Sequence, residues 1–75
     1  MSTGLIALAA AIAVGLPGAI VGIGMGMTAK EAMSSIARQP ESSKDIRSTL
    51  IIALALMEAL VIYGLLIAFM IIGKI

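Results

Sequence analysis

The sequence predicts an all-α membrane protein, a two-helix transmembrane antiparallel hairpin that assembles with identical copies into a homo-oligomeric ring. Hydrophobic residues make up 61% of the 75 residues and charged residues only 12%, and the mean hydropathy is +1.20. A water-soluble domain of this length could not cover so much apolar surface. Two stretches, 1–29 and 48–73, contain a single charged residue, Glu58. Each can cross a bilayer, which needs about 20 apolar residues as helix.

Helix is the expected form of both stretches, because a lone span must satisfy its backbone N–H and C=O groups internally. We expect one helix over about 3–37, a polar loop over about 38–44 and a second helix over about 45–74, all in a single unit covering 1–75. Pro40, among serines and charged residues, favours a turn. The first stretch lacks the basic start of a secretory signal sequence, so we assign it to the mature protein.

Positive residues indicate how the hairpin sits in the membrane. Lys30, Arg38, Lys44 and Arg47 flank or form the loop, whereas Lys74 lies at the other end. Loops rich in lysine and arginine stay on the cytoplasmic side. We therefore expect an integral, multi-pass membrane protein with a cytoplasmic loop. The start of the chain has no organellar transit-peptide pattern, which favours a bacterial plasma membrane.

One face of the first helix consists of residues with small side chains. At about 100° per residue, an arc of about 100° contains Gly4, Ala7, Ala11, Gly15, Gly18, Gly22, Gly26 and Ala29. Small residues let helix backbones approach closely in lipid, where packing rather than the hydrophobic effect drives association. This face spans the whole crossing, so we expect contact with other copies along it, at Gly15, Gly18, Gly22, Gly24 and Gly26. Pro17, which has no N–H, predicts a local bend.

Glu58 is the most informative residue of the second stretch. A carboxylate at the centre of a transmembrane helix costs about 2.5–3.5 kcal/mol, so such residues are functional-site candidates. Folding the chain back about residues 41 and 42 brings Glu58 level with Met25, facing the bare glycine run. Desolvation favours the neutral acid, so we expect a group that is protonated in lipid and ionised only beside water or a cation. That behaviour predicts a proton carrier; the alternative is a hydrogen-bonded carboxyl that only fixes helix packing.

Composition argues against several other functions. The chain contains no cysteine and no histidine, so we expect no metal site and no cofactor. No basic tail suggests nucleic acid, and no cluster of nucleophile, base and metal ligand suggests catalysis by this chain alone. Two alternatives stay open. An oligomeric pore-forming hairpin would need a continuous polar stripe, where the second helix offers only Glu58 and Tyr63. A structural adaptor would tolerate Glu58→Gln.

Three motifs occur together: the glycine run Gly22-Ile23-Gly24-Met25-Gly26, the loop Ile36-Ala37-Arg38-Gln39-Pro40-Glu41 and the segment Met57-Glu58-Ala59-Leu60-Val61-Ile62-Tyr63-Gly64. With them the whole chain resembles the c-subunit of F-type ATP synthases, the proteolipid of the rotor ring. The resemblance implies that Glu58 binds one ion per copy, releases it beside an essential arginine of the stator a-subunit, and reloads from the opposite half-channel. It also implies that Arg38, Gln39 and Pro40 contact the central-stalk subunits gamma and epsilon, and that glycines line the inner wall of the ring. ATP chemistry would then take place on other subunits.

The carried ion is expected to be the proton. Sodium is a hard cation that needs several oxygen ligands, and one carboxylate cannot supply them. Sodium-type members of the family that the chain resembles have a glutamine within the glycine run and a hydroxyl residue directly after the carboxylate. This chain has Met25 and Ala59 at those positions. Tyr63 and backbone carbonyls are the remaining oxygen donors, so a sodium-carrying ring is the alternative.

Overall fold

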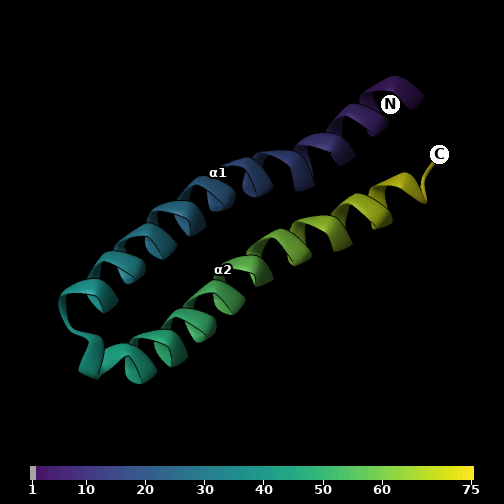
Figure 1. Cartoon of the computed structure of the whole chain (residues 1–75). Helices are drawn as coiled ribbons and strands as arrows, with labels where there is room; N and C mark the ends of the chain where they lie inside the picture. Colours follow the sequence, from purple (N-terminus) through teal and green to yellow (C-terminus); the bar gives the residue numbers. More distant parts are fainter. Residues whose placement is uncertain (1) are drawn as a thin grey trace.

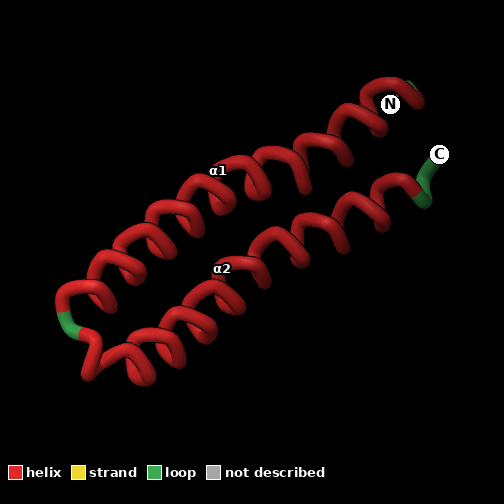
Figure 2. The backbone as a smooth tube through the Cα atoms, viewed as in Figure 1, coloured by secondary structure: helices red, strands yellow, loops and turns green. Residues whose placement is uncertain are grey.

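The computed structural model describes residues 2–75. It is a hairpin of two long helices that run antiparallel, side by side (Figure 1). Helix α1 spans Thr3–Arg38, a short 3₁₀ turn η1 spans Pro40–Ser42, and helix α2 spans Ser43–Ile72. The backbone trace is helical almost throughout, and both ends of the chain lie at the same end of the hairpin (Figure 2). The predicted all-α, two-helix hairpin is thereby confirmed.

Local capping and turn chemistry set the ends of the helices. The Ser2 hydroxyl accepts a hydrogen bond from the Leu5 amide at 3.1 Å and caps α1, which satisfies one of the free N–H groups of the first turn. At the other end, Gln39 leaves the helical region (φ −133°, ψ 73°), because the ring of the following Pro40 disfavours helical geometry at this residue. Pro40 then begins η1, and α2 follows directly at Ser43. Of the loop expected over about 38–44, only Gln39 thus lies outside the α-helices and the 3₁₀ turn.

Helix α1 continues through Pro17 without interruption. Because proline has no N–H, the carbonyl of Ala13, four residues earlier, lacks its usual helical donor. That carbonyl oxygen occupies the space that a side chain at Gly64 would need, and the Pro17 ring lies 3.6 Å from the same position. The two helices approach closely here, because Gly64 has no Cβ.

The hairpin by itself buries little of its surface. Ala10 and Ala68 are 4% and 6% exposed, and with Gly64 they are the buried residues of the described chain. Its length of 56 Å exceeds the roughly 30 Å of a bilayer core, so the polar turn extends beyond the lipid. Both helices are long and apolar enough to cross a membrane. The exposed leucines and isoleucines along them therefore face lipid or other protein.

Candidate functional site

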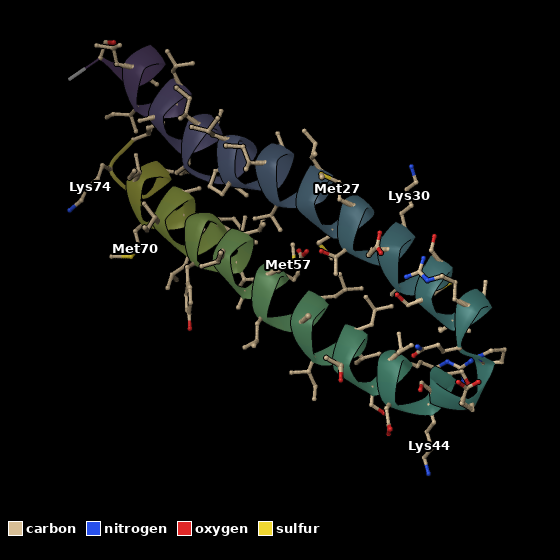
Figure 3. All side chains as sticks on the ribbon, turned by 90° about the vertical axis from the view of Figure 1, so that its left-hand side faces the viewer. Met27, Lys30, Lys44, Met57, Met70 and Lys74 are labelled. Atoms are coloured by element: carbon tan, nitrogen blue, oxygen red, sulfur yellow. The ribbon has the colours of Figure 1, made fainter. Side chains whose placement is uncertain are left out.

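Met57 fixes the depth of the candidate site within the hairpin. Its side chain points toward α1 (Figure 3), and its Cε atom lies 3.1 Å from the position that a Cβ on Gly24 would take. One turn further along α2, the Val61 Cγ1 atom lies 3.7 Å from the corresponding position at Gly18. We call this line of contacts between the helices the seam. Glu58 follows Met57 directly, so it lies at the depth of the glycine run, as expected from the sequence.

The Glu58 side chain, however, does not face the glycines of its own chain. It is exposed, and among residues 2–75 its carboxylate makes no hydrogen bond or ion pair. Neighbouring residues of a helix point about 100° apart, and Met57 takes the position against α1. Glu58 is therefore turned away from the seam by about 100°, at the edge of the hairpin. A neighbouring copy, lipid or water would meet the carboxylate there.

The five glycines expected at contacts between copies divide into two groups. A side-chain atom at Gly15, Gly22 or Gly26 would meet nothing within 4 Å. Gly18 and Gly24 instead lie against Val61 and Met57 of the same chain. Two of the five glycines thus pack the hairpin itself, and the other three are open within a single copy.

The hairpin has two different sides. The angle of each residue around its helix, measured from the seam, determines the side on which that residue lies. In an antiparallel pair, the same sense of rotation on both helices leads to the same side. At about 100° per residue, the side that carries Glu58 also carries Gly4, Ala11, Gly15, Gly22 and Arg47; we call it the glycine face. The other side carries Leu16, Ile20, Met27, Asp45 and Tyr63; we call it the bulky face. Leu16, Ile20 and Met27 are 57%, 63% and 68% exposed.

The expected neighbours of the carboxylate lie in different places. Met25 and Ala59 are half-buried, and neither has a side-chain oxygen. Tyr63 is 63% exposed and lies on the bulky face, turned about 140° from Glu58 around α2. A single copy therefore does not bring the Tyr63 hydroxyl to its own carboxylate. A hydroxyl from the bulky face can approach Glu58 only from another copy.

The polar turn forms the far end of the hairpin. Arg38 lies 3.6 Å from the Glu31 carboxylate and donates a hydrogen bond to the Ser35 hydroxyl at 3.2 Å. Gln39 and Pro40 are exposed at the tip. The three residues expected to contact other subunits thus lie together on an accessible surface, with Arg38 held by its own helix.

Sequence reasoning did not single out Gly64 or Met57 as packing residues. The available signal was their spacing, because residues seven apart fall on the same side of a helix. Leu50, Met57 and Gly64 share that spacing. A glycine in such a series, opposite a proline on the other helix, indicates that the two helix backbones approach each other closely.

Comparison with known proteins agrees with this architecture. The family model for the ATP synthase C-subunit matches residues 8–71. An ATP synthase c-subunit of Syntrophomonas wolfei subsp. wolfei is 54% identical over 69 residues, which cover 92% of this chain and 96% of the relative. The c-subunits of Synechococcus sp. and Nostoc sp. are each 57% identical over 61 residues, which cover 81% of this chain and 75% of each relative. With the two-helix hairpin and the mid-helix carboxyl, these matches show that the chain belongs to the ATP synthase c-subunit family, the rotor subunits of F-type ATP synthases.

Proposed function

We propose that Glu58 carries one proton per copy and that its protonation and release couple proton flow to rotation and ATP synthesis. The observation that supports this most directly is the position of the carboxylate. It lies at mid-depth on the edge of the hairpin, without a partner among residues 2–75. A charged carboxylate there is costly in lipid, and a protonated one is not. The group can therefore move through lipid when neutral and give up its proton where water or a cation reaches it.

The chemistry around Glu58 supports a proton rather than sodium. Sodium would require several oxygen ligands, and the half-buried residues at this depth, Met25 and Ala59, offer none from their side chains. A proton needs only the carboxylate itself. Tyr63 of another copy could hold the carboxyl in place by a hydrogen bond without serving as an ion ligand.

The two faces of the hairpin support assembly into a ring. On α1 the glycine face carries the small residues Gly4, Ala11, Gly15 and Gly22, whereas the bulky face carries large exposed side chains, so the α1 parts of the two faces fit each other better than each fits itself. Such contacts are heterologous, and heterologous contacts around an axis close into a ring. In that arrangement α1, with the smaller side chains, takes the more crowded inner position. Each Glu58 then lies at a junction between two copies.

The remaining partners follow from the ends and the edge of this ring. We assign the exposed turn around Arg38, Gln39 and Pro40 to contact with the central-stalk subunits gamma and epsilon. The ionised Glu58 requires a cation during release, which an essential arginine of the stator a-subunit supplies. The loop then faces the cytoplasm of a bacterial cell, in accord with its lysines and arginines, and the catalytic sites lie on other subunits. Membrane lipid covers the outer surface.

Carbodiimide labelling tests the proposal. A hydrophobic carbodiimide reacts with protonated carboxyl groups, so its reaction rate with the membrane-embedded protein reports the protonation of Glu58. Water-exposed carboxyl groups have pKa values near 4 and are therefore mostly ionised above about pH 5. We expect the labelling of one residue to persist well above that pH. Sodium should not slow the reaction. The variant Glu58→Gln should lose the labelling, while the matched variant Glu41→Gln, in the exposed turn, should keep it.

Two outcomes would contradict the proposal in different ways. Protection of Glu58 by millimolar sodium would mean that the ring carries sodium. Absence of labelling at every pH, in protein that is folded and assembled, would mean that the carboxyl is never neutral in lipid, and the carrier mechanism would be wrong.

A further inference from the structure

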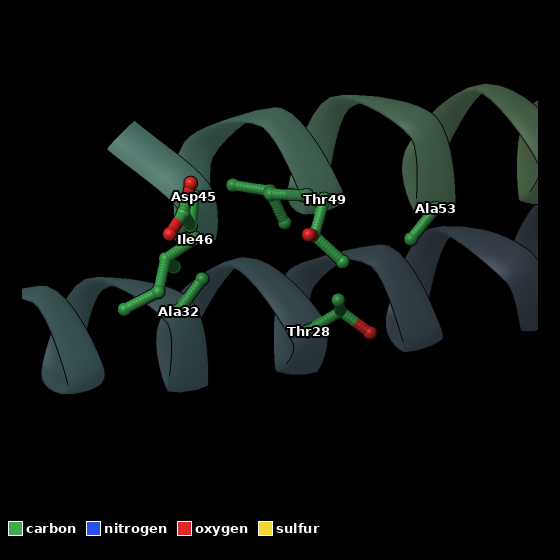
Figure 4. Close-up of a pocket in the computed structure, with 7 residues that line it drawn as sticks. Thr28, Ala32, Asp45, Ile46, Thr49 and Ala53 are labelled. Carbon is green, nitrogen blue, oxygen red and sulfur yellow. The ribbon is translucent and has the colours of Figure 1, made fainter. Parts of the chain in front are cut away.

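A groove lies between the helices near the turn, well away from Glu58. Its volume is about 330 Å³, and it is lined by Thr28, Ala32, Asp45, Ile46, Thr49, Leu50 and Ala53. Figure 4 shows Asp45 and Thr49 of α2 and Thr28 of α1 bordering this space. The lining is mostly apolar, but it contains one carboxylate and two hydroxyls and no cation. Its chemistry therefore suits a group with an apolar stem and a positively charged, hydrogen-bonding head.

Asp45 makes no ion pair within residues 2–75. The ion pair of residues 2–75 joins Arg38 to Glu31 and leaves Asp45 without a partner. Asp45 also lies on the bulky face, which the proposed ring turns toward a neighbouring copy. The exposed carboxylate is therefore free to pair with a cation of a neighbouring copy.

Arg47 is the complementary group on the opposite side of the hairpin. It follows Asp45 by two residues, and winding by about 200° places it on the glycine face. Its side chain is exposed, and it too has no ion pair within residues 2–75. Each hairpin thus presents an unpaired anion on one face and an unpaired cation on the other, at nearly the same height.

We propose that Arg47 of each copy inserts into the groove of the next copy and pairs with Asp45 there. This inference rests on the ring of the proposed function. Rotation about the membrane normal keeps all copies level, so the two residues differ in height by only about 3 Å, two helical rises of about 1.5 Å. The arginine stem packs on Ile46 and Leu50, and the guanidinium donates to the Asp45 carboxylate and the Thr49 hydroxyl. Charge-assisted hydrogen bonds of this type are among the stronger polar contacts.

Asp45 also lies in the first turn of α2, where a negative charge stabilises the helix dipole. That role depends only on the charge at position 45 of the same chain. The pairing proposed here depends on the sign of the charge on a neighbouring copy. An experiment that exchanges the two charges therefore distinguishes the two roles.

Thiol cross-linking tests the contact, because the chain contains no cysteine. An extended arginine paired with a carboxylate leaves the two Cα atoms farther apart than the roughly 7 Å that a disulfide can bridge, so a short bismaleimide is used to join the thiols. Asp45→Cys and Arg47→Cys proteins are assembled together, treated with this reagent and run in denaturing gels. In these gels each single variant alone should run as a monomer, and a mixture of the two should give covalent dimers. A mixture of Asp45→Cys with Ser48→Cys, whose side chain points away from α1 at the same height, is the matched control.

Charge exchange provides the second measurement. Asp45→Arg and Arg47→Asp should each lower the temperature at which the oligomer dissociates in mild detergent, because like charges then meet in the groove. The double variant Asp45→Arg/Arg47→Asp should recover most of that loss. Carbodiimide labelling of Glu58 in each variant reports that the hairpin itself is intact.

The outcomes separate this contact from the ring on which it rests. Failure of the mixed Asp45→Cys and Arg47→Cys proteins to form dimers with the bismaleimide, in preparations that assemble like the unchanged chain, would overturn the Arg47–Asp45 contact and leave the ring standing. If the dissociation temperature fell equally in the single variants and in the double variant, the Arg47–Asp45 contact would likewise be overturned and the ring would stand. Failure of the unchanged chain to form oligomers would overturn both.

Discussion

Replacing Gly64 by alanine will weaken the packing of α1 against α2. The added Cβ would overlap the carbonyl oxygen of Ala13 and meet the Pro17 ring at 3.6 Å. The obstacle is backbone, which cannot rotate away as a flexible side chain would. The seam must therefore open at Gly64.

The size of the effect follows from two opposing terms. Overpacking by one methyl group costs about 1–3 kcal/mol, whereas alanine has a helix propensity about 0.5–1 kcal/mol better than glycine. A net loss of about 1–2 kcal/mol corresponds to a roughly 5–30-fold change in the ratio of packed to separated helices.

Fluorescence energy transfer measures this ratio. Dyes on Thr3→Cys and Lys74→Cys lie at the end of the hairpin where both termini meet (Figure 1), and their separation follows opening during titration of the monomeric hairpin with a denaturing detergent. Gly64→Ala should lower the detergent content at the midpoint. Gly15→Ala is the matched control, since a side chain there meets nothing within 4 Å. A midpoint for Gly64→Ala equal to or above that of Gly15→Ala would refute the reasoning.

Two further predictions concern the open glycines and the choice of ion. Gly22→Leu should leave the opening midpoint of the monomer unchanged, because nothing lies within 4 Å of that position, but should prevent assembly as measured by native oligomer mass; a fall in the midpoint would mean that Gly22 packs the hairpin. Met25→Gln combined with Ala59→Ser adds two oxygen ligands near Glu58, so sodium should then slow carbodiimide labelling. Labelling that stays indifferent to sodium would show that these two positions do not border the ion.

The sequence alone determined that the chain lies in lipid, how many times it spans the membrane and at what depth Glu58 lies. Two apolar stretches separated by charged residues allow only a pair of helices in lipid, because each backbone polar group must be paired within its own span. The depth of Glu58 follows from counting residues away from the turn, since the rise per residue of a helix is fixed. The contact of Met57 with Gly24 agrees with that count.

The directions in which side chains point were decided by the tertiary structure. Periodicity places residues on faces of a helix, but it does not say which face meets the other helix until both are packed. Thus Gly18 and Gly24 pack the hairpin while Gly15, Gly22 and Gly26 stay open, and Glu58 lies at the edge because Met57 takes the seam. The close approach of Gly64 to Ala13 and the groove at Asp45 depend on the same pairing of faces. Helical winding is a local property that the sequence determines, whereas the rotation of one helix against another is set by the fit of side chains across the seam.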